Sequence, residues 1–302
     1  MHRPARSRLA AGVIAALAVV ALAGCATAAP SASGEPESSS AHEGDTRVAV
    51  AYDGGIVVLD GETLETVDSA ELDGFLRVNP AGDHDGHVFV TAADGFHVLD
   101  TGLASDTVEF TGEVFDAVTP GHATPHAGRT ALFDDGTGDV TLFDTDAVGT
   151  GTLPESQTVE SEAAHHGVAI ELSDGTLLST IGTSESRSGV RLLADDGSEL
   201  ARDEQCPGVH GEGALKGETI VFGCEDGVLV FADGAFTKLD APDAFGRSGN
   251  AYVTDTSAIA ALDYKSDPDQ EGYLLSQLAL VDTDAQTLSL IHISEPTRQA
   301  EI

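Results

Sequence analysis

Short runs of apolar residues recur along the chain, and each run lies next to an Asp or a Gly. The second residues of these runs are separated by 38 to 50 positions. Pairs such as Asp94-Gly95 and Asp226-Gly227 join most of them to a preceding apolar run, and Asp-Gly in that position is a strong indication of a β-hairpin. The runs are Gly55–Asp60, Gly95–Asp100, Asp139–Asp144, Gly189–Ala194, Gly227–Ala232 and Gln277–Asp282.

The spacing of the runs predicts an all-β fold of the β-propeller class. Several runs are apolar at consecutive positions, so both faces of those strands should be covered. A period near 40 to 50 residues is typical of propeller blades, whereas it is long for a β-sandwich or a β-helix, the two alternatives. The first repeat begins at Arg47 without an innermost strand. Six partial or complete repeats therefore indicate a seven-bladed ring over residues 46–287, with its last blade missing here.

The charge balance excludes some classes of function. The chain of 302 residues has 14 Lys and Arg against 51 Asp and Glu, a formal charge of −37. A nucleic-acid binder needs basic residues that displace counterions, so that class is excluded. The same acidity argues against attraction to an anionic membrane surface. Hydrophobic residues make up 41% of the chain, which is too many for a disordered protein.

The N-terminus has the features of a targeting segment. Arg3, Arg6 and Arg8 precede an apolar run over 9–23, and small residues stand just before Cys25. This pattern resembles a bacterial lipoprotein signal over residues 1–24, with Cys25 acylated and 25–45 a flexible tether. A short membrane anchor is the alternative, although the run is short for a spanning helix. We expect a protein that is exported and lipid-anchored on the outer face of the cytoplasmic membrane, or periplasmic.

The C-terminus, residues 288–302, has a different character. Its run LSLIHISEPTR resembles a translated frame of a transposon adapter used in sequencing libraries. We therefore expect a non-native tail, with the natural chain continuing past about Thr287. The alternative is an ordinary strand, because Leu288 and Leu290 are suitably placed for pairing.

Three histidines fall at matching positions of successive repeats. His122, His166 and His210 each precede the next apolar run by 8 to 10 residues, at the start of an innermost strand. Innermost strands line the centre of a propeller, so we expect the three imidazoles to converge on a Zn²⁺ ion. The alternative is that these rings bond to carbonyls at strand ends. Weaker candidates for a fourth ligand or a supporting contact are His126, His165 and Glu212.

Two further groups of residues carry chemistry. His84 and His87 lie in an acidic turn, where a weak second metal site competes with the simpler interpretation of an exposed turn. Cys206 and Cys224 flank the strand pair of His210. In an exported protein they are expected to form a disulfide; the alternative is a Cys–Cys–His zinc site.

These motifs together resemble the AztD-type periplasmic zinc chaperones. The resemblance rests on HHGVA at 165–169, CPGVHGE at 206–212 and GCEDGVL at 223–229, supported by GHATPH at 121–126 and FDDG at 133–136. It implies a β-propeller that binds zinc centrally and passes it to the substrate-binding protein of a zinc ABC importer. It also implies a further His in a late blade, and this sequence has none before residue 288.

The resulting hypothesis is an exported zinc chaperone rather than an enzyme. Its partners would be the importer's binding protein and, through the lipid on Cys25, the membrane. Two alternatives remain. One is a metal-dependent propeller hydrolase or lactonase, since three His and an open position suit water activation. The other is a metal-free, lipid-anchored interaction scaffold.

Overall fold

The computed structural model describes residues 46–269 and 275–293, which fold into consecutive antiparallel sheets. The expected signal peptide, Cys25, the tether and residues 294–302 lie outside this range. In the described part no helix is both long and apolar enough to cross a bilayer. Two short 3₁₀ turns, η1 (Thr145–Ala147) and η2 (Lys216–Glu218), interrupt the strands.

The strands are grouped in chain order into six sheets, the first with three strands and the others with four. The first three sheets are β1 (Arg47–Tyr52), β2 (Gly55–Asp60) and β3 (Thr66–Glu71); β4 (Arg77–Pro80), β5 (His87–Ala92), β6 (Gly95–Thr101) and β7 (Val108–Asp116); and β8 (Pro120–His126), β9 (Arg129–Asp134), β10 (Val140–Asp144) and β11 (Ser156–Val159). The last three are β12 (Ala169–Glu171), β13 (Leu177–Gly182), β14 (Arg187–Leu193) and β15 (Glu199–Asp203); β16 (His210–Ala214), β17 (Ile220–Cys224), β18 (Gly227–Ala232) and β19 (Ala235–Asp240); and β20 (Ala251–Tyr252), β21 (Ile259–Tyr264), β22 (Gln277–Asp282) and β23 (Thr287–His292).

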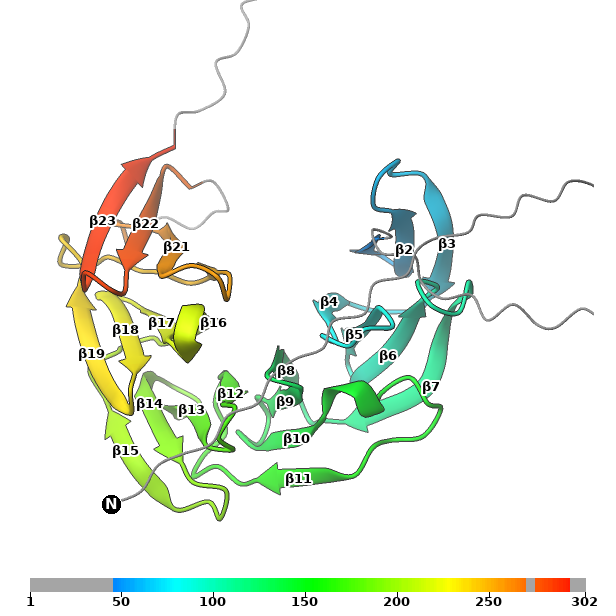
Figure 1. The fold of residues 1–302 in the computed structure, drawn as a ribbon, viewed down its shortest axis with the longest axis horizontal. Helices are drawn as coiled ribbons and strands as arrows, with labels where there is room; N and C mark the ends of the chain where they lie inside the picture. The colour runs from blue at the N-terminus through cyan, green and yellow to red at the C-terminus, as the bar shows by residue number, and fades with distance from the viewer. Residues whose placement is uncertain (1–45, 270–274, 294–302) are drawn as a thin grey trace, which may run out of the picture. The chain divides into compact units, whose positions relative to one another are not determined.

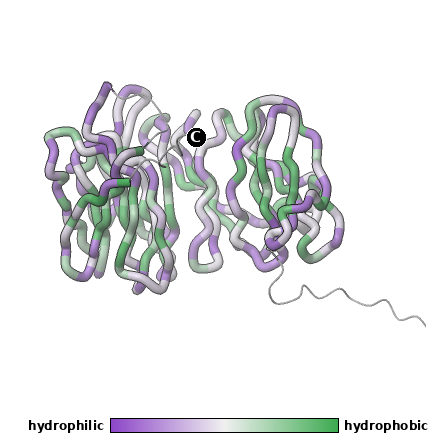
Figure 2. Tube along the Cα trace, turned by 90° about the horizontal axis from the view of Figure 1, so that it is seen from above, coloured by the Kyte–Doolittle hydropathy of each residue, from purple (hydrophilic) through white to green (hydrophobic). Residues whose placement is uncertain are grey.

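The core is divided among the faces between consecutive sheets, as expected for strands covered on both sides. In β18, Leu229 and Phe231 pack toward the fourth sheet, whereas Val228 and Val230 pack toward the sixth. Five apolar clusters of this kind lie between consecutive sheets, one cluster for each neighbouring pair from the first sheet to the sixth. Figure 2 shows the hydrophobic stretches within the strands and the hydrophilic residues gathered at the turns. The all-β, propeller-like prediction is confirmed.

The first strands of the sheets lie side by side and position the candidate site. In Figure 1, β4, β8, β12 and β16 are the inner strands of their sheets. Strand β8 contacts both β4 and β12. The first sheet, β1–β3, has the three strands expected for a repeat without its innermost strand. The seven-bladed ring stays a prediction.

Residues 287–292 form the fourth strand of the last sheet, with Leu288 opposite Val281 and Leu290 opposite Ala279. Both leucines pack on the cluster between the last two sheets. This is the pairing foreseen by the alternative interpretation of the tail, so the folded region extends beyond the expected boundary at 287. Alternating apolar residues pair in a sheet whatever their origin, so the adapter origin of 288–302 stays a prediction.

Candidate metal centre

Three imidazoles from three different sheets meet at the inner strands. His122 is on β8, His166 lies three residues before β12, and His210 is the first residue of β16. Their ring centroids are 5.0 to 5.3 Å apart. One ligand atom from each ring lies within 4.8 Å of the other two. The structure therefore brings together the three histidines selected by their spacing; that they bind a metal stays a prediction.

Local irregularities of the strands aim these rings. The register of β8 against β9 shifts between Pro120 and Ala123, so the backbone bulges at His122. The register of β16 against β17 shifts between His210 and Glu212. A bulge redirects the side chains beside it, which allows an edge residue to point toward the centre.

Glycines make room for these bends. Gly211 has a φ of 66°, a left-handed conformation that favours glycine, and an added Cβ would meet the Gly249 oxygen at 2.3 Å. Next to His166, a Cβ on Gly167 would lie 2.4 Å from the Phe133 ring. Each histidine thus has a glycine as its direct neighbour because the chain is too crowded there for a side chain.

Two acceptors set the tautomers of His166 and His210. The Nδ1 of His166 lies 2.5 Å from Asp135 Oδ2, and the Nδ1 of His210 donates to the Gly249 carbonyl. A carbonyl and a carboxylate only accept, so each Nδ1 carries the proton and each Nε2 presents a lone pair. The two Nε2 atoms are 2.9 Å apart. Two lone pairs at that distance repel each other unless a proton or a metal cation lies between them.

Burial keeps the remaining ring in the same neutral form. Burial, with the charges of His210 and His166, lowers the pKa of His122 to about 3. Its buried Nε2 has no hydrogen-bond partner among the described residues. Burial also lowers the pKa of His210. Neutral imidazoles are the form that ligates zinc, so burial favours the ligand form of His122 and His210.

A cleft of about 520 Å³ opens beside this trio. Its lining includes His166, Arg187, Pro207, Gly208 and Glu225, together with the turn 183–186. His166 is the member of the trio that lines the cleft. A molecule entering the cleft therefore meets the ring held by Asp135.

The weaker candidates are engaged elsewhere. His126 Nε2 is 2.9 Å from Glu218 Oε1. His165 is 3% exposed, and both its ring nitrogens are used, by the Ala163 carbonyl at 2.9 Å and the Thr180 hydroxyl at 3.1 Å. Because the latter two partners satisfy the ring, His165 has the arrangement of a structural histidine.

Glu212 follows His210 by two residues on β16. Its carboxylate accepts from the Thr124 hydroxyl at 2.9 Å, and burial raises its pKa. It is not one of the group of ligand atoms that meet within 4.8 Å. Of the six residues expected from the sequence, the structure groups only the three at matched positions.

The acidic turn differs from its expected exposure. His84 is exposed, but His87 is 7% exposed and its Nδ1 lies 2.5 Å from Asp83 Oδ2. Its Nε2 is 4.0 Å from Asp100. The bond with Asp83 raises the pKa of His87. The pair is a buried polar contact between the turn and β5, because His87 is the first residue of β5 rather than the last residue of the turn.

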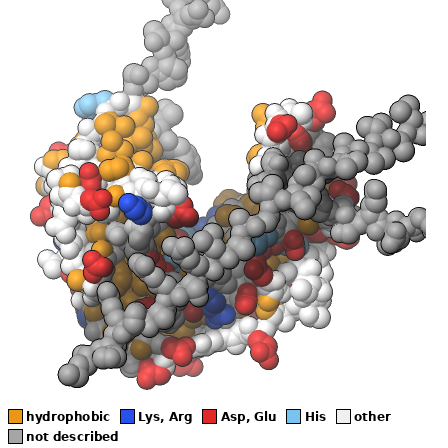
Figure 3. All heavy atoms as spheres, in the orientation of Figure 1, with side chains coloured by type: hydrophobic (Ala, Val, Ile, Leu, Met, Phe, Trp, Pro, Cys, Tyr) orange, Lys and Arg blue, Asp and Glu red, His pale blue; other side chains and the backbone are white. Residues whose placement is uncertain are grey.

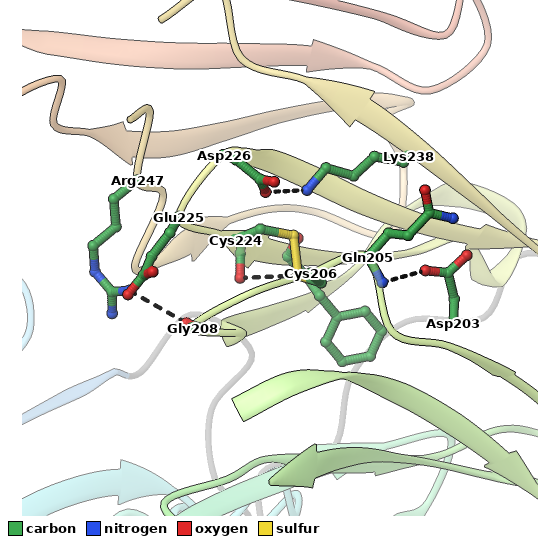
Figure 4. The surroundings of a disulfide bond; sticks show 11 residues. Asp203, Gln205, Cys206, Gly208, Cys224, Glu225, Asp226, Lys238 and Arg247 are labelled. Carbon is green, nitrogen blue, oxygen red and sulfur yellow. Dashed lines mark hydrogen bonds and ion pairs between the residues drawn. A yellow bond between two sulfur atoms is a disulfide. The ribbon is translucent and has the colours of Figure 1, made fainter. Parts of the chain in front are cut away.

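Cys206 and Cys224 are joined in a disulfide with a Cα–Cα distance of 4.9 Å. This confirms the expected pairing, and it excludes the Cys–Cys–His zinc site in this oxidised state because both sulfurs are bonded to each other. Figure 4 shows the bond near Glu225, Arg247 and Gly208, and Glu225 and Gly208 line the cleft. The bond ties the segment leading to His210 to the end of β17.

Sequence reasoning missed the groups that orient the rings. Asp135 is part of the FDDG segment, and Gly249 lies 39 residues from His210. A carboxylate after a strand is common, so the sequence carried little signal for Asp135. A backbone carbonyl carries none.

Comparisons with known proteins support the resemblance. No family model matches the chain. The protein named zinc chaperone AztD of Citrobacter koseri is 30% identical over 114 residues, which are 37% of this chain and 27% of that protein. The matched part thus spans about a quarter of the relative's length.

Solved structures share the fold. Apo AztD from Citrobacter koseri has a TM-score of 0.65 at 20% identity, covering 82% of this chain and 70% of that chain. A second structure of Citrobacter koseri AztD has a TM-score of 0.55 at 16% identity, covering 85% and 83%. A protein of unknown function from Bacteroides caccae has 0.54 at 14% identity, covering 81% and 93%. The curated match and these structures together support an AztD-type relationship.

Proposed function

We propose that this chain, of the AztD type by sequence match and fold, carries one zinc ion as cargo on His122, His166 and His210. The observation that carries the proposal is the facing pair of Nε2 atoms, 2.9 Å apart, on two rings whose Nδ1 atoms are already held. Tetrahedral zinc with bonds of 2.0–2.1 Å needs its nitrogens about 3.3 Å apart. The rings of His166 and His210 need to move apart by only a few tenths of an ångström, and the ligand atom of His122 lies within 4.8 Å of theirs.

A carrier has to release its ion as well as hold it. Three neutral imidazoles fill three of the four positions that zinc prefers, and the fourth is reached through the cleft beside His166. A ligand from a partner protein can enter that position before the histidines let go. Zinc is the substrate of such a transfer, and no bond other than coordination is made or broken.

The proposed recipient is the substrate-binding protein of a zinc ABC importer. The relative's name, zinc chaperone, supports a carrier role, and the delivery step extends it. We further propose that the chain acts outside the cytoplasm, held by a lipid on Cys25. The disulfide supports an oxidising compartment because such bonds persist there.

Zinc binding is tested by competition with a chromophoric chelator, using the full chain. The expected result is one zinc ion per chain, with affinity at least about tenfold lower in His166→Ala, as is common when a metal site is perturbed. His97→Gln is the matched control because His97 bonds to Asp94, away from the trio. Equal affinity of His166→Ala and the unsubstituted chain would disprove the assignment. Transfer of zinc from the loaded chain to the zinc-free substrate-binding protein is then measured.

The ligand set itself favours one second function, a hydrolase. Three His and an open position also suit a zinc-bound water. Zinc-dependent turnover of esters or lactones that is lost in His166→Ala would favour that enzyme. The scaffold alternative predicts no zinc retained in equilibrium dialysis.

A further inference from the structure

Arginines gather around the three histidines although the chain is strongly acidic. It has 14 Lys and Arg against 51 Asp and Glu, and Figure 3 shows acidic side chains scattered over the visible face. The charges of Arg77 and Arg187 act on His122, and those of Arg187 and Arg247 act on His210. Positive groups beside a cation site weaken it by repulsion. Their presence calls for a second, negative component.

Arg187 has the position to bind that component. It lines the cleft together with His166, is half-buried, and makes no side-chain hydrogen bond to another described residue. Burial and the nearby charge of Arg247 lower its pKa. A guanidinium with unused donors, placed beside another, is a typical receptor for a carboxylate.

Arg247 lies behind the part of the cleft wall that Gly208 and Glu225 form. Its Nη1 donates to the Gly208 carbonyl at 3.3 Å and lies 3.5 Å from Glu225 Oε1 (Figure 4). The residues that hold it are themselves fixed, because Glu225 N donates to the Pro207 carbonyl at 2.8 Å next to the disulfide. Arg247 therefore holds a positive charge behind the cleft wall on a rigid support.

The carboxylates of the chain near the trio are already used. Asp135 accepts from His166 and from the Gly167 backbone, and Glu212 accepts from Thr124. Glu225 lies against Arg247. Glu185 is on the exposed turn of the cleft and is outside the group of ligand atoms within 4.8 Å. Within residues 46–269 and 275–293 no further carboxylate is thus free to take the fourth position, which suits a ligand from outside this part of the chain.

We propose that the cleft is a subsite for an external carboxylate, held by Arg187 and favoured by the nearby charge of Arg247, which becomes the fourth ligand of the zinc ion on the three histidines. This inference rests on the proposed zinc-carrier function and names the chemistry of the incoming group. The carboxylate enters as an anion and displaces a water molecule, so no proton or electron is transferred. Since coupling is reciprocal, zinc and the carboxylate each strengthen the binding of the other.

Cobalt(II) makes the fourth ligand visible. The full chain is loaded with Co²⁺, and its visible d–d bands are followed during titration with acetate, with acetamide as the uncharged control. A second pair of probes is N-acetyl-Gly-Glu-Gly-amide and its Gln counterpart. We expect saturable band shifts with acetate and the Glu peptide only. Tighter binding of the peptide than of acetate identifies a protein-borne side chain as the source; equal binding identifies a free carboxylate.

Variants assign the effect to the arginines. Arg187→Gln should weaken acetate binding about tenfold, as expected for a lost charge-assisted pair. Arg202→Gln is the matched control, because Arg202 bonds to Glu199 and Glu204 on the outer strand β15. An unchanged acetate affinity in Arg187→Gln would overturn the proposal. So would a changed starting spectrum in Glu185→Gln, since that would reveal an internal fourth ligand.

The experiment separates the two levels of inference. If Co²⁺ binds once per chain and is lost in His166→Ala, the carrier site stands; absence of any acetate effect then overturns the carboxylate subsite alone. If Co²⁺ does not bind at the trio, both proposals fall.

Discussion

His166 and His210 face each other through their Nε2 atoms, 2.9 Å apart, while Asp135 and Gly249 hold the opposite sides of the rings. Neither ring can turn without losing its Nδ1 bond. The pair is therefore set for a cation before the cation arrives, which reduces the reorganisation that binding requires.

Asp135→Asn should lower zinc affinity by about 10- to 100-fold, the range typical of partners that orient a metal ligand. The amide is a poorer acceptor than the carboxylate, and it allows the His166 ring to change tautomer. Chelator competition measures the loss. Asp116→Asn, an exposed position on β7, serves as the control. Wild-type affinity in Asp135→Asn would show that the carboxylate does not orient the ligand.

Acid should destabilise the metal-free protein through His122. Its pKa is lowered to about 3 in the folded chain, whereas an unfolded His has a pKa near 6.5. Below pH 6.5 His122 takes up a proton in the unfolded chain but not in the folded chain. The free energy of unfolding therefore decreases as the pH is lowered from 6.5. The expected loss from this group is about 1 kcal/mol between pH 6.5 and 5.5. Urea unfolding should show a correspondingly smaller loss in His122→Gln; equal losses would contradict the assignment.

Gly211→Ala should weaken both the fold and zinc binding. The left-handed backbone costs a residue with a Cβ about 1–2 kcal/mol, and the new Cβ would also press on the Gly249 oxygen that holds His210. Gly197→Ala is matched in backbone conformation, with a φ of 80°, but has open space around it. The control should lose stability alone. Equal zinc affinities of the two variants would argue against a role of the bulge in aiming His210.

Removal of the disulfide, by changing Cys206 and Cys224 to Ala together, should cost about 2–4 kcal/mol of unfolding free energy. His210 follows Cys206 by four residues and pairs with Gly223, which precedes Cys224. Zinc affinity should therefore fall several-fold as well. Urea unfolding and chelator competition give the two values. A loss of stability with unchanged zinc affinity would show that the disulfide does not contribute to zinc binding.

His126→Ala should leave zinc affinity within about twofold, because His126 bonds to Glu218 instead of meeting the trio. Melting temperature should fall, since Glu218 also accepts from the Ser173 backbone at 2.6 Å and so connects neighbouring sheets. A tenfold loss of zinc affinity would restore His126 as a ligand.

Much of this arrangement was predictable from the chain. The recurring apolar runs define the sheets, and equal positions in equal repeats lie at equal depth, which is why His122, His166 and His210 meet. Proximity in sequence was a poorer guide: His165, beside His166, bonds to Ala163 and Thr180 instead of meeting the trio. The positions of the bulges and of the Gly249 carbonyl depend on tertiary packing, and no residue type in the sequence predicts them.

The three rings come from β8, from the segment leading into β12 and from β16, and each of these strands belongs to a different sheet with its own ladder of hydrogen bonds. A shared ion would act as a cross-link through the third, fourth and fifth sheets, adding about 4 kcal/mol to the folded state when free zinc exceeds Kd a thousandfold. Loading would then tighten the unfolding of residues 120–240 into one cooperative step. Slower amide exchange in this span would report that the chain is carrying its cargo.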